Sequence, residues 1–148
     1  MSEGNSNRRL GRSIGAVLAG FVLIFVSSLG TDVILHATGV FPPWGQPMSE
    51  GLYVLASIYR AVYAVVACAI TARLAPRAPL GHALALGALG VVVSSLGAAA
   101  TWDMVPALGP RWYPLHLIAV SLPLAWLGGK LGSFSRRGPA ALAAGSAS

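Results

Sequence analysis

The sequence predicts an all-α integral membrane protein: a four-transmembrane-helix bundle with short loops. Of its 148 residues, 55% are hydrophobic and 9% are charged, whereas about a quarter of the residues in an ordinary soluble domain are charged. Four apolar runs follow one another along the chain, and each reaches the roughly 20 residues that a helix needs to cross the hydrocarbon core of a bilayer. The single cysteine, Cys68, excludes an intramolecular disulfide and a CxxC redox couple.

We expect the spans at about residues 13–37, 51–74, 80–101 and 113–132. A polar, basic segment, 1–12, precedes the first span, which is longer than the apolar part of a signal peptide and is therefore expected to stay in the protein. Segments rich in proline and glycine separate the spans, because these residues interrupt helices. The small, polar residues 133–148 are expected to form a disordered tail behind the membrane domain, 13–132.

Positive charges flank the spans unequally, and this bias predicts the orientation of the chain. With the N-terminus in the cytoplasm, eight Lys and Arg residues lie at the cytoplasmic ends of the spans and only Arg111 lies at the opposite ends. Basic residues concentrate on the cytoplasmic side of multi-pass proteins. We therefore expect a multi-pass protein of the bacterial inner (plasma) membrane, N-in/C-in. The eight residues are Arg8, Arg9, Arg12, Arg73, Arg77, Lys130, Arg136 and Arg137.

Small residues follow one face of the third span and predict where the helices pack. Association of helices in lipid depends on close approach of their backbones, which small side chains permit. The residues at helical spacing are Ala83, Gly87, Gly90, Ser94, Gly97 and Thr101. We interpret this stripe as a packing seam of a central helix. A further set of glycines, Gly128, Gly129 and Gly132, lies at the end of the fourth span.

Two ionisable residues inside the spans form the candidate site. Asp32 in the first span and Arg60 in the second lie at depths that an arginine side chain can bridge, and charges within a bilayer require a partner or a function. His36 and Tyr63 lie at helical spacing from them, and His116 near the start of the fourth span is expected to join. These residues predict a polar cluster at the outer surface, which is either a structural ion pair or a site for a ligand.

Metal and haem remain further alternatives. His36, His116 and Asp32 could hold a metal, or the two histidines could ligate one haem, but the chain carries no HExxH or CxxCH motif. We expect no metal and no cofactor. No nucleophile motif such as GxSxG occurs, so an enzyme is less expected than a binding or structural protein.

The outline of four spans in a short chain resembles the small multidrug resistance exporters. Those proteins carry a glutamate in the first helix, whereas this chain has Asp32 near the outer end of its first span, and the eight-to-one charge bias disfavours the dual topology known in that family. We therefore expect a small inner-membrane protein of unknown role. An oligomeric secondary transporter or channel subunit using Asp32 and Arg60 is the alternative. The expected partners are the bilayer and another copy or another membrane protein, and not nucleic acid, because the basic residues lie at the ends of the spans.

Overall fold

A computed structural model describes the backbone of residues 3–104 and 109–145 and the side chains of residues 7–104 and 109–135. Within these residues the chain is all-helical and contains no strand. The elements are α1 (Glu3–Ala37), α2 (Glu50–Leu74), α3 (Pro79–Thr101), a 3₁₀ turn η1 (Trp102–Met104) and α4 (Trp112–Gly145).

All four α-helices contain a stretch that is long and apolar enough to cross a membrane. The stretches are Asn7–Ala37, Glu50–Leu74, Pro79–Met104 and Trp112–Ser135. Large hydrophobic side chains are exposed along the outside of the bundle, including Phe25, Leu96 and Phe134, as is typical of surfaces that face lipid. The predicted all-α architecture with four helices of membrane-spanning length is confirmed, and it indicates a multi-pass membrane protein.

The first and last helices of the chain, α1 and α4, extend beyond the predicted spans. α1 begins at Glu3 rather than near residue 13, because the polar segment before the span contains no proline that would interrupt it. α4 continues to Gly145, through most of the segment expected to be a disordered tail, and its alanines favour helix. Residues 1–2 and 146–148 lie outside the described residues.

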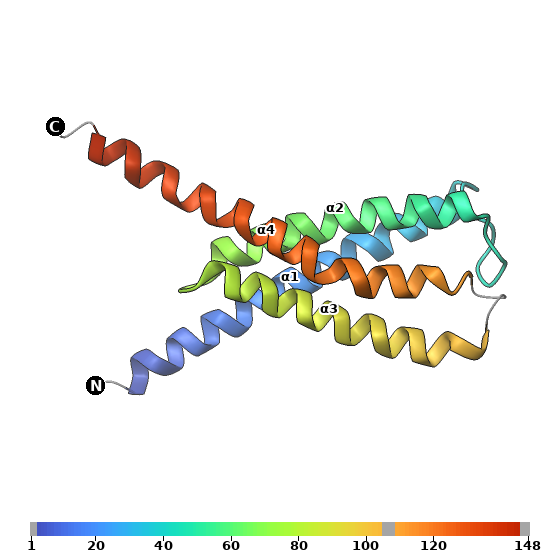
Figure 1. Ribbon diagram of the computed structural model, residues 1–148, viewed down its shortest axis with the longest axis horizontal. Coiled ribbons are helices and arrows are strands. Elements are labelled where there is room, and N and C mark those ends of the chain that lie inside the picture. The colour runs from blue at the N-terminus through green and yellow to red at the C-terminus, as the bar shows by residue number, and fades with distance from the viewer. Residues whose placement is uncertain (1–2, 105–108, 146–148) are drawn as a thin grey trace.

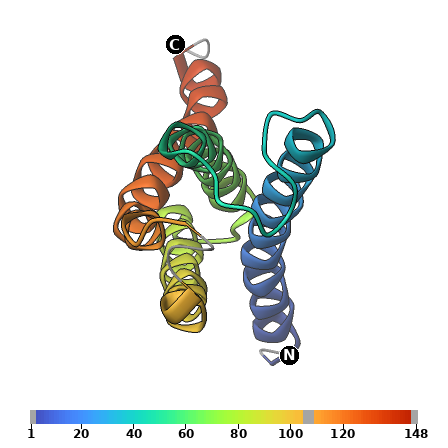
Figure 2. The same ribbon diagram turned by 90° about the vertical axis from the view of Figure 1, so that its right-hand side faces the viewer.

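The helices run alternately up and down, so that the two ends of the bundle differ (Figure 1). Both ends of the chain and the short α2–α3 connection lie at one end, here called the terminal end. The α1–α2 and α3–α4 connections lie at the opposite end, here called the loop end. α4 packs against both α2 and α3, whereas α1 packs mainly against α2 on the far side from α4 (Figure 2).

Close backbone approach at glycines holds α2, α3 and α4 together near the terminal end. A Cβ atom on Gly128 would lie 2.7 Å from Cβ of Cys68, and one on Gly87 would lie 2.5 Å from Cβ of Ala125. Gly132 faces the backbone of α2 in the same way. Real carbon atoms do not approach so closely, so the helices can pack at this separation only because these residues lack side chains. The buried core around this contact consists of Ala67, Cys68, Ala72, Ala83, Leu86 and Ala125.

The predicted small-residue stripe of α3 forms a seam over only half its length. Gly87 and Gly90 face Ser121 and its neighbours on α4, whereas a Cβ on Gly97 would meet nothing within 4 Å. The two helices diverge towards the loop end (Figure 1), and a groove of about 400 Å³ lies between them at Ser94 and Gly97. The divergence explains why identical small residues pack tightly at one end and loosely at the other.

These contacts predict opposite effects for one substitution at two glycines of α3. Gly87→Ala is expected to lower stability by about 1–3 kcal/mol, because the added methyl group pushes α4 away. Gly97→Ala enters open space and is expected to be neutral or to raise stability by up to about 1 kcal/mol through helix propensity. Thermal unfolding of the purified variants in detergent measures both effects. Equal losses of stability at the two positions would contradict the conclusion that α3 packs tightly against α4 at Gly87 and loosely at Gly97.

Candidate functional site

Asp32 of α1 and Arg60 of α2 form an ion pair between neighbouring helices. Nη2 of Arg60 lies 2.6 Å from Oδ2 of Asp32, and the two side chains are 28% and 15% exposed, respectively. It is the one ion pair among the side chains that the structure describes. Because each charge is held inside an apolar helix, the pair offsets a desolvation cost that either residue alone would carry in full.

Two tyrosines complete the hydrogen bonding of this pair and connect it to a third helix. The Tyr59 hydroxyl donates to Oδ1 of Asp32, and Nη1 of Arg60 donates to the Tyr113 hydroxyl of α4. The Arg60 guanidinium also lies 5.8 Å and 5.7 Å from the ring centres of Tyr59 and Tyr113, within the range of cation–π attraction. We call Asp32, Tyr59, Arg60 and Tyr113 the charge cluster. It joins α1, α2 and α4 at the loop end.

The other predicted site residues lie at different distances from this cluster. His36 borders it: its Nδ1 is 2.7 Å from the backbone oxygen of Asp32, and its ring stacks on Trp44 with ring centres 3.7 Å apart. Tyr63 lies one turn deeper, where its hydroxyl pairs with that of Thr31 at 2.8 Å. Tyr63 therefore helps to hold α1 against α2, and its ring borders the charge cluster through Tyr59, with ring centres 5.9 Å apart.

His116 is not brought to the cluster. Its ring lies beside Trp112, with ring centres 6.3 Å apart, while Tyr113, three residues earlier on α4, reaches Arg60. The sequence alone does not single out Tyr113, because a tyrosine at the start of a span is typical of the membrane surface. In the structure its ring also lies against Tyr53 of α2, with ring centres 5.2 Å apart.

A pocket of about 220 Å³ opens above the ion pair at the loop end. Its lining includes Asp32 and Arg60, and its aromatic residues are His36, Phe41, Trp44, Tyr53 and Tyr113. The α1–α2 connection covers it, turning at Gly39 and Gly45, whose φ angles of 75° and 80° are readily adopted only by glycine. We call this the loop-end pocket. It is smaller than the roughly 300–1,000 Å³ of sites that take drug-sized molecules.

The same ion pair also lines a second opening on the side of the bundle. This lateral groove, of about 380 Å³, lies between α1 and α3, with Phe21, Phe25 and Val93 as apolar walls. Oγ of Ser28, also in the lining, is buried and makes no hydrogen bond within the described residues. Asp32 and Arg60 are therefore accessible both from the loop end and from the side.

Within the described residues, no three His, Cys, Asp or Glu side chains come together in a group that could hold a metal ion. His36 and His116, the two candidate haem ligands, pack against different aromatic residues, Trp44 and Trp112. In comparisons with known proteins, no family model, curated protein or solved structure matches the chain.

Energetic coupling between Asp32 and Arg60 is expected from their contact. Asp32→Asn and Arg60→Gln should each lower stability, because each leaves the other charge unpaired at the edge of an apolar bundle. The double variant should lose less than the sum of the two, with a coupling energy of about 1–3 kcal/mol. Thermal or chemical unfolding of the four proteins in one detergent measures this cycle, and strictly additive losses would show that the pair contributes nothing.

Proposed function

We propose that the protein is a multi-pass protein of the bacterial inner membrane that binds a small zwitterion in the loop-end pocket, on the outer face of the membrane. The observation that carries this proposal is the position of the ion pair. Asp32 and Arg60 line the pocket beneath aromatic walls. Charged residues in spans commonly mark sites for ligands.

The chemistry of the lining supports a zwitterion over a simple ion. The pair is formally neutral, so it offers no net attraction to an anion or a cation alone. Arg60 keeps hydrogen-bonding capacity, because the structure records bonds from two of its five N–H donors, to Tyr113 and to Asp32. A carboxylate of the ligand would accept hydrogen bonds from Arg60. A quaternary ammonium group, which donates no hydrogen bond, would lie near the Asp32 carboxylate and against the aromatic rings, which attract cations.

A second candidate function is transport by an oligomer. It is favoured by the two openings that meet at the ion pair, the loop-end pocket and the lateral groove. Four helices scarcely enclose a path by themselves, so a carrier of this size would act as an oligomer. Proteoliposomes that exchange a bound zwitterion across the membrane, and lose this exchange in Asp32→Asn, would favour transport over binding alone.

The orientation that the proposal requires rests on the distribution of positive charge. A reporter that is active only outside the cytoplasm is expected to give a signal when inserted near Gln46, in the α1–α2 connection, and none when fused after Ser148. The reason is the eight-to-one excess of basic residues at the terminal end. The reverse pattern would place the loop-end pocket in the cytoplasm and contradict the proposal.

Binding is tested with glycine betaine, which carries a quaternary ammonium group and a carboxylate. We expect it to raise the unfolding temperature of the purified protein in a concentration-dependent way, since a ligand that binds only the folded state stabilises it. Choline and acetate, which each carry one of the two groups, should have a smaller effect.

Two tryptophan variants provide a matched comparison for this assay. Trp44→Leu removes a wall of the pocket and is expected to abolish the stabilisation by glycine betaine. Trp102→Leu removes a tryptophan of η1, whose ring lies against Arg111 and not in the pocket, and should preserve it. The same response in both variants, or none in the wild type, would show that the pocket is not a zwitterion site.

A further inference from the structure

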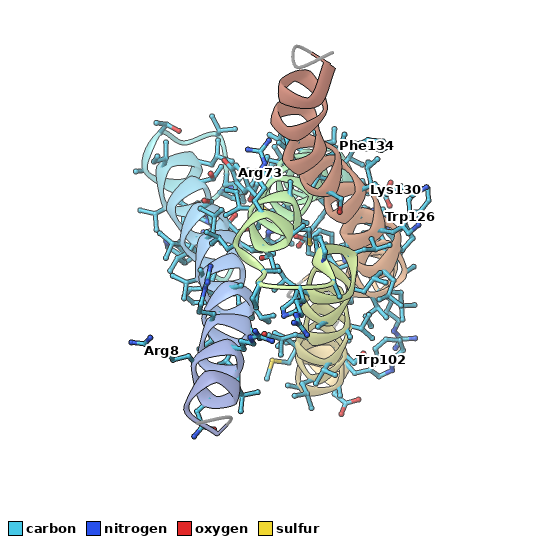
Figure 3. The ribbon with its side chains drawn as sticks, turned by 90° about the vertical axis from the view of Figure 1, so that its left-hand side faces the viewer. Arg8, Arg73, Trp102, Trp126, Lys130 and Phe134 are labelled. Atoms are coloured by element: carbon cyan, nitrogen blue, oxygen red, sulfur yellow. The ribbon has the colours of Figure 1, made fainter. Side chains whose placement is uncertain are left out.

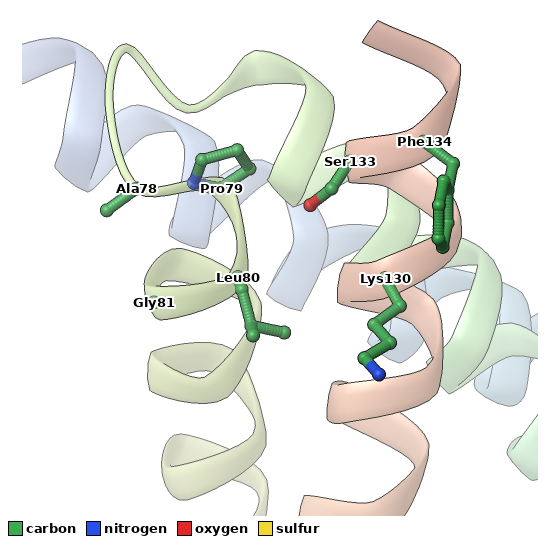
Figure 4. Close-up of a pocket in the computed structure, with 7 residues that line it drawn as sticks. All are labelled: Ala78, Pro79, Leu80, Gly81, Lys130, Ser133 and Phe134. Atoms are coloured by element: carbon green, nitrogen blue, oxygen red, sulfur yellow. The ribbon is translucent and has the colours of Figure 1, made fainter. Parts of the chain in front are cut away.

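A groove at the terminal end lies between the beginning of α3 and the last described side chains of α4. Its volume is about 410 Å³, and it is lined by Pro79 and Leu80 from α3 and by Lys130, Ser133 and Phe134 from α4 (Figure 4). The Leu80 side chain points across the groove towards α4. Leu80 and Phe134 give the groove apolar walls, and Lys130 is the single charged residue of its lining.

Lys130 is exposed and has no acidic partner among the described side chains. Its Nζ lies 4.1 Å from the ring centre of Trp126, one turn earlier on the same face of α4 (Figure 3). An ammonium group over an indole ring keeps its N–H donors available, because the ring takes no strong hydrogen bond from them. The side chain is thus held in place with its charge uncompensated.

Lys130 lies near the point where the apolar part of α4 ends in the sequence. Ser133 and Ser135 follow it, and the basic residues Arg136 and Arg137 come next. Long basic side chains are favoured at the boundary between the hydrocarbon core and the headgroups. Tryptophan, here Trp126, also favours this boundary.

The described charged side chains of the terminal end are all basic. Of the four acidic residues, Asp32, Glu50 and Asp103 belong to the loop half of the bundle, and the side chain of Glu3 lies outside the described residues. The described basic side chains of the terminal end are Arg8, Arg9, Arg12, Arg73, Arg77 and Lys130. Such a surface attracts anionic lipids, and basic pockets between transmembrane helices bind their headgroups.

We propose that this groove binds an anionic phospholipid from the leaflet at the terminal end. The phosphate lies at the ammonium group of Lys130, and an acyl chain follows the apolar walls formed by Leu80 and Phe134. The apolar walls distinguish a lipid from a free phosphate ion, because inorganic phosphate gains nothing from burying them. A zwitterionic lipid also carries a phosphate, but the described lining offers no acidic side chain to its ammonium group, so the single lysine favours a lipid with net negative charge.

Native mass spectrometry of the detergent-purified protein, after incubation with equal amounts of phosphatidylglycerol and phosphatidylcholine, tests the proposal. The wild type is expected to retain phosphatidylglycerol preferentially. Lys130→Gln is expected to weaken retention about five-fold, the equivalent of the roughly 1 kcal/mol that one basic residue contributes near an anionic surface. Lys130→Arg keeps the charge and should retain the lipid.

Arg8→Gln is the matched control, because it removes the same charge from the terminal end at a site far from the groove (Figure 3). It should leave the retention nearly unchanged. Equal losses in Lys130→Gln and Arg8→Gln would show diffuse attraction and overturn the site. Phe134→Ala should also weaken retention, and displacement of the lipid by an equal concentration of glycerol phosphate would show that the groove takes a soluble anion instead. The outer parts of Lys130 and Phe134 are exposed, so these variants are expected to fold.

Discussion

Close approach of helix backbones near the terminal end is the constraint on which the rest of the structure depends. Lipid removes the hydrophobic incentive for helices to associate, so van der Waals contact over matched surfaces must replace it. Gly87, Gly128 and Gly132 allow that contact between α4 and its neighbours. On α1, Gly20 faces Thr71, whose hydroxyl also donates to the Ala16 backbone oxygen at 3.2 Å. These contacts set the relative rotation of the helices and thereby determine which side chains meet at the loop end.

The loop end is held together by a different kind of interaction. There the helices separate, and polar side chains bridge the distances that backbones no longer close. Asp32, Tyr59, Arg60 and Tyr113 satisfy one another across three helices, which keeps two charges in an apolar setting without leaving either unpaired. The separation that requires these bridges also leaves space for the loop-end pocket and the lateral groove.

The two ends therefore offer chemically distinct surfaces from one short chain. The loop end combines a neutral ion pair with aromatic walls, and the terminal end combines unpaired positive charge with an apolar groove. The charge asymmetry that is expected to orient the chain during insertion also concentrates the basic residues at the end of the bundle that carries the proposed lipid site. One feature of the sequence thus serves both the topology and the lipid interaction that we propose.

The number and order of the helices and the bounds of α2 and α3 follow from the sequence alone, because a span is defined by local composition and length. The extensions of α1 back to Glu3 and of α4 on to Gly145 do not, because polar and small residues can continue a helix beyond the apolar span. The candidate charges in the spans also follow from the sequence, because Asp32 and Arg60 are identified by their charge whatever the packing of their helices. The residues that contact them do not follow from the sequence. Tyr113 and His116 lie on the same turn of α4 and are equally plausible from spacing, and only the rotation of α4 against α2 brings Tyr113 to Arg60 and leaves His116 beside Trp112. Trp44 belongs to a connection whose path depends on two glycines in the left-handed region. Such contacts arise between segments far apart in the chain, and no local pattern encodes the distance between them.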